Sequence, residues 1–367
     1  MRWIATKRNH VDWVLLAAVT FLLAVGTIVL FAIEEAAVNQ VNFSPYKHLL
    51  HVVVGVILAF VVYRSNYAIW YRLGTWLYWI SIVLLVVVLF ANPTAGSSRW
   101  IELGFIQFQP SELAKFSLVI LLARLFAHRS GQMSKIPNLL LSILYMAIPV
   151  VLTLLQPDLG TAVVFIVIWL SMIAVSDVRP LYLAVGGIVV AAAVMFAIPN
   201  LADYQQQRIT TFLDPAADPR GAGYNVRQAT IAIGSGGLIG QGLDSGSQSQ
   251  LNFLPAQHTD FIFAVISEKL GFIGAAAIVF AFAVIVVQAL RKALRLKSGF
   301  ATHLALGFGV LLAFHAIINI GMNLGLVPVT GLPLPFLSYG GTHLIMIMAI
   351  VGILLSIERT NELSYSD

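Results

Sequence analysis

Residues 261–290 read FIFAVISEKLGFIGAAAIVFAFAVIVVQAL, an apolar run in which only Glu268 and Lys269 are charged. A membrane-spanning helix needs about 20 mostly apolar residues, so this run is long enough to cross a bilayer. With Asp260, which precedes it, the run would form a helix about 46 Å long, against a hydrocarbon core of about 30 Å. Residues 270–290 already suffice. We therefore expect the turns that carry Glu268 and Lys269 to tilt, protrude or line a wet cavity near the outer leaflet.

The rest of the chain repeats this apolar pattern. Of its 367 residues, 59% are hydrophobic and 10% are charged, which excludes an ordinary soluble protein. In lipid the backbone must satisfy its own hydrogen bonds in helices or closed barrels, and the runs lack the alternation of barrel strands. We predict an all-α polytopic membrane bundle, a single integral domain over residues 1–367. About ten transmembrane helices are expected, at 13–33, 46–63, 74–90, 113–127, 139–155, 159–175, 181–198, 261–290, 301–326 and 336–357.

The distribution of charge predicts the orientation of the bundle. Most Lys and Arg residues, including a cluster at 291–297, fall on one side if both termini are cytoplasmic, which agrees with the positive-inside rule. The first run has no small-residue cleavage site and is expected to remain as a helix. Nothing in this pattern indicates nucleic-acid binding. The absence of cysteine excludes disulfides, thiolate nucleophiles and Cys metal sites.

With both termini cytoplasmic, the long polar segment 199–259, between the seventh and eighth runs, is expected to lie outside the membrane. Most connections are about 4 to 6 residues long, so a segment of this size is expected to be functional or disordered. Its apolar residues favour packing onto the bundle, and residues 224–233 have the spacing of an amphipathic helix lying flat at the interface. The glycines in 234–237 and 240–242 either form anion-binding nests or simply make turns.

Asp260 is the strongest candidate for a functional residue. It closes the polar segment and stands directly before the apolar run. A carboxylate at the mouth of a membrane segment is costly unless it is hydrated, paired or working. We therefore place the centre of function at Asp260.

Further charged residues reach the same outer face from other connections. Glu112 and Lys115 follow Pro110 at a helix start, where they either form a local ion pair or serve a site. Asp158 follows Pro157, either as the N-cap of the sixth helix or as a functional acid. Arg99 beside Trp100 either binds a phosphate or anchors the interface.

The last outer connection, residues 328–342, reads PVTGLPLPFLSYGGT. Its prolines and glycines interrupt helical backbone near the membrane, which is tolerated where protein or a cavity satisfies the freed groups. We interpret this break, with Ser338 in it, as a wall of a binding site. Histidines 48, 51, 303, 315 and 343 lack the spacing of a metal motif, so spacing assigns no metal site.

Four blocks of sequence carry a resemblance to a known family. They are SSRWIELGFIQFQPSELAK at 97–115, QPDLGTA at 156–162, the pair FLDPAADPRGAGYNVRQATIAIGSGGL and NFLPAQHTDFIFAVISEKLGF at 212–238 and 252–272, and PVTGLPLPFLSYGGT at 328–342. Over nearly its whole length the chain resembles the SEDS (shape, elongation, division and sporulation) membrane proteins of the RodA and FtsW type.

This resemblance implies a peptidoglycan glycosyltransferase that polymerises lipid II outside the bacterial cytoplasmic membrane, in cell elongation or division, with a class B penicillin-binding transpeptidase as partner. It implies an essential acid at Asp260 and cavity residues at Glu112, Lys115 and Asp158. A divalent cation, Mg or Mn, is implied as a cofactor. Lys269 stands where the resemblance leads us to expect a second acid beside Glu268.

The residues suggest a chemistry that fits this implication. No ATP is available outside the membrane, so a substrate there must carry its own leaving group, as an undecaprenyl pyrophosphate does. Our hypothesis makes Asp260 the general base on the acceptor 4-hydroxyl, which attacks the donor anomeric carbon with inversion. Arg99 and Lys115 would hold pyrophosphate, and Glu268 and Ser338 would line the substrate site. The rival functions are a lipid II flippase using Asp158, Glu112 and Glu268, and a scaffold for partner enzymes.

Overall fold

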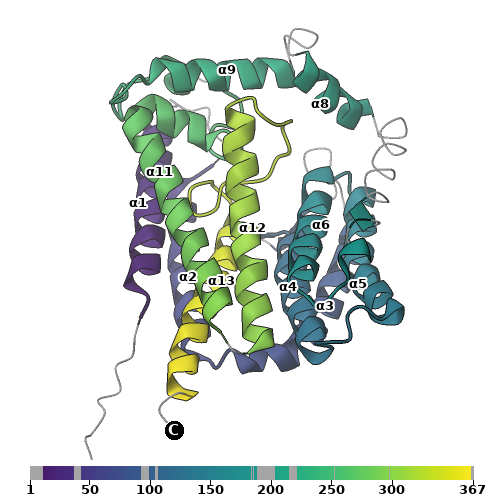
Figure 1. Ribbon diagram of the computed structural model, residues 1–367. Coiled ribbons are helices and arrows are strands. Elements are labelled where there is room, and N and C mark those ends of the chain that lie inside the picture. Colours follow the sequence, from purple (N-terminus) through teal and green to yellow (C-terminus); the bar gives the residue numbers. More distant parts are fainter. Residues whose placement is uncertain are drawn as a thin grey trace, which may run out of the picture.

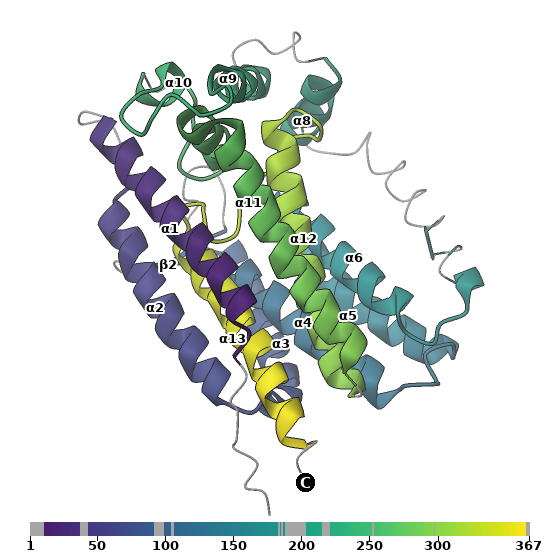
Figure 2. The same cartoon turned by 60° about the vertical axis from the view of Figure 1, so that its left-hand side comes forward.

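The computed structural model describes residues 11–36, 43–91, 99–103, 106–182, 184, 186–187, 203–214, 221–251, 253–296 and 298–364. Long helices form a bundle, and three shorter helices cover one end of it (Figures 1 and 2). The helices of the bundle are α1 (Trp13–Ala36), α2 (Pro45–Arg64), α3 (Ala68–Leu89), α4 (Pro110–His128), α5 (Ile136–Leu155), α6 (Leu159–Ala174), α11 (Ile262–Arg295), α12 (Gly299–Asn323) and α13 (Gly341–Ser364). The covering layer contains α8 (Asp203–Leu213), α9 (Ala222–Ser235) and α10 (Ser247–Gln250).

The predicted all-α membrane bundle is confirmed. Nine of the ten predicted runs coincide with these helices, and the tenth, at 181–198, lies mostly outside the described residues. Among the described helices, seven are long and apolar enough to cross a membrane. Of the other two in the bundle, α4 carries three charged residues and α6 has only 16 residues. The count of ten spans therefore stays a prediction.

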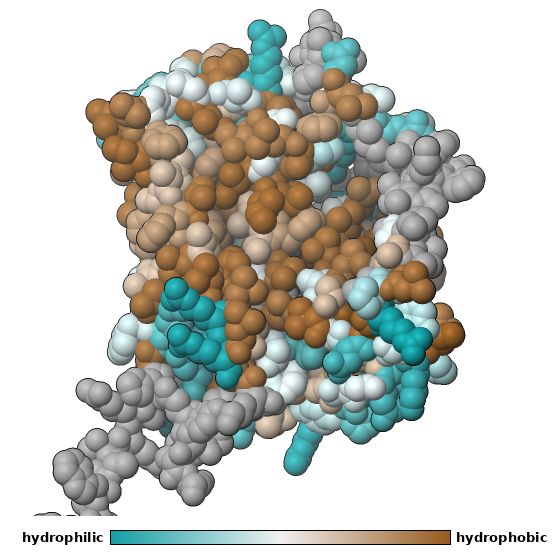
Figure 3. Space-filling view, viewed as in Figure 1, coloured by the Kyte–Doolittle hydropathy of each residue, from teal (hydrophilic) through white to brown (hydrophobic). Residues whose placement is uncertain are grey.

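The face of the bundle seen in Figure 3 is mostly apolar along its length, and hydrophilic residues gather toward its ends. Large apolar side chains such as Trp76 and Phe280 are more than 70% exposed, as expected for residues that face lipid. The centre of the bundle is formed by α12 and α13. Of the apolar stretch of each helix, 67% is buried in α12 and 78% in α13, whereas only 22% is buried in α2. Helix α4 joins them there, since most of its residues are buried.

The described ends of the chain lie at the same end of the bundle, opposite α8–α10 (Figure 1). Lys292, near the end of α11, contacts both Asp12, just before α1, and Glu358, near the end of α13. The side of the membrane on which the two termini lie stays a prediction.

Helix α11 is broken at Gly271, whose φ of 67° and ψ of −168° are not helical. Which part of this run spans the membrane stays a prediction. The break frees backbone groups that the loop after α9 satisfies: Gln241 and Gly242 donate to the carbonyls of residues 268 and 269, and Phe272 and Ile273 donate to those of residues 237 and 238. All four hydrogen bonds are 2.9–3.1 Å long.

The glycines around α9 serve this contact between backbones. A Cβ at Gly240 would lie 2.1 Å from the carbonyl oxygen of Lys269, and a Cβ at Gly236 would lie 2.0 Å from that of Ser267. The sequence offered anion-binding nests or turns for these glycines. The structure favours turns, because the amides of Gly240, Gln241 and Gly242 already donate to protein carbonyls and are not available to an anion.

The predicted helix at 224–233 is confirmed as part of α9, which lies across the end of the bundle (Figure 2). Its Ala229 and Ala232 are fully buried, so one face packs onto the bundle as expected for an amphipathic helix. A small antiparallel hairpin, β1 (Ile101–Leu103) and β2 (Ile106–Phe108), precedes α4 and was not predicted. The last predicted run begins later than expected, because residues 336–340 are not helical and α13 starts at Gly341.

Candidate functional site

Asp260 lies two residues before the start of α11. Its backbone carbonyl accepts hydrogen bonds of 3.0 Å from the side-chain amides of Asn319 and Asn323, which lie one turn apart on α12. Its carboxylate faces Gly331, where an added Cβ would come within 3.8 Å of Oδ2. The backbone is therefore fixed by α12, while the carboxylate remains partly exposed.

The segment 328–339, which we call the wall segment, lies opposite Asp260 at Gly331, and its role as the wall of a binding site stays a prediction. The Ser338 hydroxyl donates to the carbonyl of Thr259 at 2.6 Å and accepts from the amide of Leu334 at 2.8 Å. The amide of Tyr339 donates to the carbonyl of His258 at 2.8 Å. Ser338 is only 2% exposed, so the structure places it in the framework of the wall, and its contact with substrate stays a prediction.

Two arginines lie near the carboxylate. Arg99 donates to the carbonyls of Gln156, at 3.1 Å, and Pro157. Arg208 comes from α8, and sequence reasoning missed it, although it is the only cationic residue in DYQQQRITTFL. Burial raises the pKa of the Asp260 carboxyl, and the charges of Arg208 and Arg99 and a hydrogen bond with Thr259 oppose that rise. The net pKa stays above the ordinary value.

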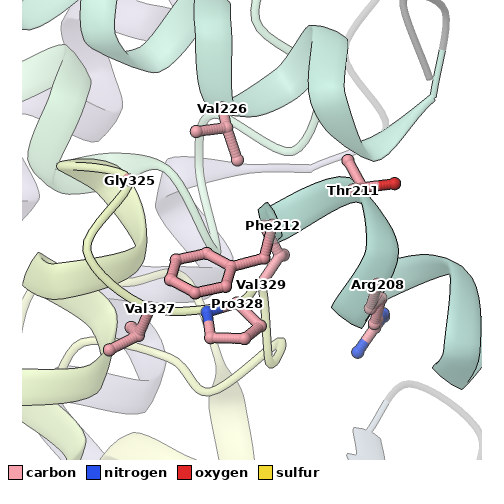
Figure 4. A pocket seen from close by; sticks show the side chains of 8 residues that line it. All are labelled: Arg208, Thr211, Phe212, Val226, Gly325, Val327, Pro328 and Val329. Carbon is pink, nitrogen blue, oxygen red and sulfur yellow. The ribbon is translucent and has the colours of Figure 1, made fainter. Parts of the chain in front are cut away.

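Arg208 also lies at a cavity between α8 and the start of the wall segment (Figure 4). The cavity has an empty volume of ≈ 330 Å³, part of which is open to solvent. Its other lining residues are mostly apolar: Thr211, Phe212, Val226, Gly325, Val327, Pro328 and Val329. A cation beside an apolar cavity suits a ligand that is part anion and part hydrocarbon.

Asp158 adopts the N-cap role that the sequence offered as one alternative. Its carboxylate accepts from the amide and the hydroxyl of Thr161, at 3.1 and 2.9 Å, and it is 7% exposed. The turn that carries it packs against the wall segment, because a Cβ at Gly160 would lie 2.8 Å from the carbonyl oxygen of Thr330. Asp158 therefore shapes the neighbourhood of the wall, and a direct role with substrate stays a prediction.

Glu112 and Lys115 form a buried ion pair of 2.8 Å, the local pair predicted from their spacing. Two histidines complete the cluster: His343 Nδ1 lies 3.1 Å from Glu112, and His315 Nε2 lies 3.4 Å from Lys115. All four side chains are at most 4% exposed. Spacing along the chain assigned these two histidines no role. The signal available was the polar series His315, Asn319, Asn323, which recurs every four residues on one face of an apolar helix.

Glu268 and Lys269 are not brought together with Asp260 by any described contact. The Glu268 carboxylate accepts from the amides of Gln248 and Ser249 at the start of α10, at 2.8 and 3.0 Å. The Lys269 ammonium donates to the carbonyls of Leu243 and Ser245. Both residues thus hold the loop over the break in α11, and a substrate role for Glu268 stays a prediction.

The described residues contain no group of three or more His, Asp or Glu side chains that could hold a metal ion. Among the described residues around Asp260, one carboxylate lies beside two arginines, and Mg²⁺ is usually bound by one or two carboxylates together with substrate phosphates. The Mg or Mn ion expected from the resemblance stays a prediction.

Comparisons with known proteins agree with this arrangement. A family model described as "Cell cycle protein" for FtsW, RodA and SpoVE matches residues 10–363. The chain is 35% identical to "Peptidoglycan glycosyltransferase MrdB" of Escherichia coli K12, covering 95% of this chain and 93% of that protein. It is 33% identical to "Stage V sporulation protein E" of Bacillus subtilis, covering 97% and 99%.

Two solved structures share the fold. A chain described under "Structural coordination of polymerization and crosslinking by a peptidoglycan synthase complex" has a TM-score of 0.80 and 30% identity, with 100% of both chains covered. The rod shape determining protein RodA of Thermus thermophilus has a TM-score of 0.71 and 28% identity, with coverage of 97% and 98%. The resemblance inferred from the four sequence blocks is confirmed, and this multi-pass membrane protein belongs to the FtsW/RodA/SpoVE family.

Proposed function

We propose that this protein is a peptidoglycan glycosyltransferase that polymerises lipid II into glycan strands. The observation that carries the proposal is a partly buried carboxylate with a raised pKa, Asp260, near Arg208 and Arg99 at one end of a membrane bundle. The names of its relatives support the same activity, since those aligned over most of the chain include peptidoglycan glycosyltransferases.

Asp260 acts as the general base. An aspartate with an ordinary pKa of about 3.9 is a weak base, and a raised pKa brings it closer to the range in which proton transfer is efficient. Its carboxylate takes the proton of the acceptor 4-hydroxyl as that oxygen bonds to the donor anomeric carbon. The bond from this carbon to pyrophosphate breaks on the opposite face, so the configuration inverts and undecaprenyl pyrophosphate leaves.

The two arginines stabilise the leaving group. Negative charge builds up on pyrophosphate as the bond breaks, and fixed cations in a partly dehydrated site stabilise that charge. Arg208 lies beside the apolar cavity, so it meets the phosphate where the hydrocarbon chain begins. Arg99 is held by carbonyls of the turn before α6, and a guanidinium group has five N–H donors with which it can bind an anion.

The site faces the outside of the bacterial cytoplasmic membrane. The excess of Lys and Arg at the opposite end of the bundle supports this orientation. A donor that carries pyrophosphate also needs no ATP there. A class B penicillin-binding transpeptidase is the partner that crosslinks the product, an assignment supported by the structural match to a chain of a peptidoglycan synthase complex.

Polymerisation of purified lipid II by the purified protein, with and without Mg²⁺ or Mn²⁺, tests the proposal. We expect the unaltered protein to make glycan strands and Asp260→Asn to reduce the rate by at least about 100-fold, the usual contribution of a general base. Asp244→Asn, which changes an exposed acid of the same outer layer, is the matched control and should retain the rate. Strand synthesis by Asp260→Asn at the normal rate contradicts the assignment. Lipid movement between leaflets without polymer indicates a flippase instead.

A further inference from the structure

His315 sits between the buried ion pair and the wall of the proposed site. Its Nε2 lies 3.4 Å from the Lys115 ammonium, and its Nδ1 lies 3.3 Å from the carbonyl oxygen of Pro333. The residue is fully buried, so each ring nitrogen must be satisfied by these neighbours. Neither neighbour belongs to α12, and the ring therefore joins α4 to the wall segment across the centre of the bundle.

The chemistry of the neighbours fixes the tautomer of His315. A carbonyl oxygen only accepts hydrogen bonds, so Nδ1 carries the proton. An ammonium group only donates, so Nε2 must present its lone pair. The ring is then neutral and makes two hydrogen bonds of opposite direction. A side chain that can only donate or only accept cannot replace both of these hydrogen bonds.

The carbonyl held by His315 is adjacent to the residues that face Asp260. Asn319, one turn further along α12, donates to the carbonyl of Leu332 at 2.8 Å and to that of Asp260 at 3.0 Å. Gly331 comes next and lies against the Asp260 carboxylate. Three consecutive residues of the wall segment are therefore positioned by these contacts. His315 holds Pro333, Asn319 holds Leu332, and Gly331 lies opposite the Asp260 carboxylate.

We propose that His315 is a positioning residue for the glycosyl transfer, setting the distance between the wall and Asp260 through its hydrogen bond to Pro333. The proposal rests on the function proposed above. His315 does not touch the reacting atoms. It anchors the wall to the Glu112–Lys115 pair, which is itself held in the core by His343. Without the bond from Nδ1, residues 331–333 lose one of their two anchors on α12.

Two amide variants separate the two ring nitrogens. Asn places its polar group near the position of Nδ1, and Gln places it near the position of Nε2. His315→Asn should retain the bond to Pro333 and a kcat within about threefold of the unaltered protein, whereas His315→Gln and His315→Leu should lower kcat by about tenfold or more. The KM for lipid II should change much less than kcat, because the bond to Pro333 fixes residues beside Asp260, whereas the cavity next to Arg208 is lined by Gly325, Val327, Pro328 and Val329.

His303→Asn is the matched control. This histidine is on the same helix, but its Nδ1 contacts Gly299 of that helix, so we expect no loss of kcat. Hydrogen–deuterium exchange of residues 334–339 gives a readout that needs no activity: His315→Leu should speed exchange there, and His315→Asn should not. The exchange measurement tests His315 even if the unaltered protein makes no polymer. A lack of polymer would count against the proposed function and not against the role of His315. Normal kcat and normal exchange in His315→Leu, or equal loss in the Asn and Gln variants, overturn the proposal.

Discussion

Burial and neighbouring charges shift the pKa of the Asp260 carboxyl group in opposite directions. Burial raises its pKa, and Arg208 is the first of the neighbours that lower it. A general base works only when deprotonated, so activity falls at pH values below this pKa. Without the Arg208 charge, less remains to counteract the effect of burial, so the pKa of Asp260 rises further. The acid limb of activity must then move to higher pH.

Arg208→Gln should therefore shift the acid limb of kcat/KM for lipid II upward by up to about one pH unit. The KM should also rise, because Arg208 lies where the pyrophosphate is expected. The measurement is the pH profile of strand synthesis by the purified protein. Arg227→Gln, an exposed arginine on α9, is the control and should leave the profile in place. An unshifted acid limb in Arg208→Gln would show that its charge does not act on Asp260.

At the scale of elements, the break in α11 depends on one glycine. Gly271 has a positive φ, and a Cβ there would lie 2.3 Å from the amide nitrogen of Gly240. Gly271→Ala must strain the backbone and push away the loop that satisfies the break. We expect it to destabilise the protein by about 2 kcal/mol or more, measured as a lower thermal midpoint in detergent. Gly234→Ala is the control, since nothing lies within 4 Å of its added Cβ, and an equal loss in both variants would contradict this account.

Elements also show what the sequence could and could not reveal. The length of the run 261–290 exceeds the membrane thickness, but length alone did not locate the break in the helix, which lies at Gly271. The apolar runs predicted the helices because lipid requires helical backbone. The link between Lys115 and His315 crosses 200 residues of sequence, and no local pattern on α4 specifies a partner on α12. Arg208 was missed for the same reason, since its importance comes from the folding of α8 over Asp260.

At the scale of the whole molecule, one ion cluster joins the beginning and the end of the described chain, and in it Asp12 and Lys292 are buried while Glu358 is partly exposed. The Lys292 ammonium donates to Asp12 at 2.7 Å and also to Glu358, linking α11 to α13 and to the residue before α1. The Asp12 carboxylate in addition accepts from the amide of Leu15 at 2.9 Å, which caps α1. The start of α1 and the end of α11, which carry this cluster, lie at the end of the bundle opposite α8 and α9 (Figure 1).

Lys292→Met should leave the Asp12 carboxylate buried without its cation, and removing one member of such a pair typically costs about 3 kcal/mol or more. The thermal midpoint in detergent should fall, while the kcat of the fraction that remains folded should stay unchanged, because the cluster is remote from Asp260. Arg295→Gln, an exposed cation in the same last turn of α11, should keep the midpoint. The double variant Asp12→Asn with Lys292→Met should recover part of the loss, since the unpaired charge is gone. If Lys292→Met instead lowered kcat at full stability, the two ends of the bundle would be coupled, and the separation argued here between a stabilising end and a reacting end would be wrong.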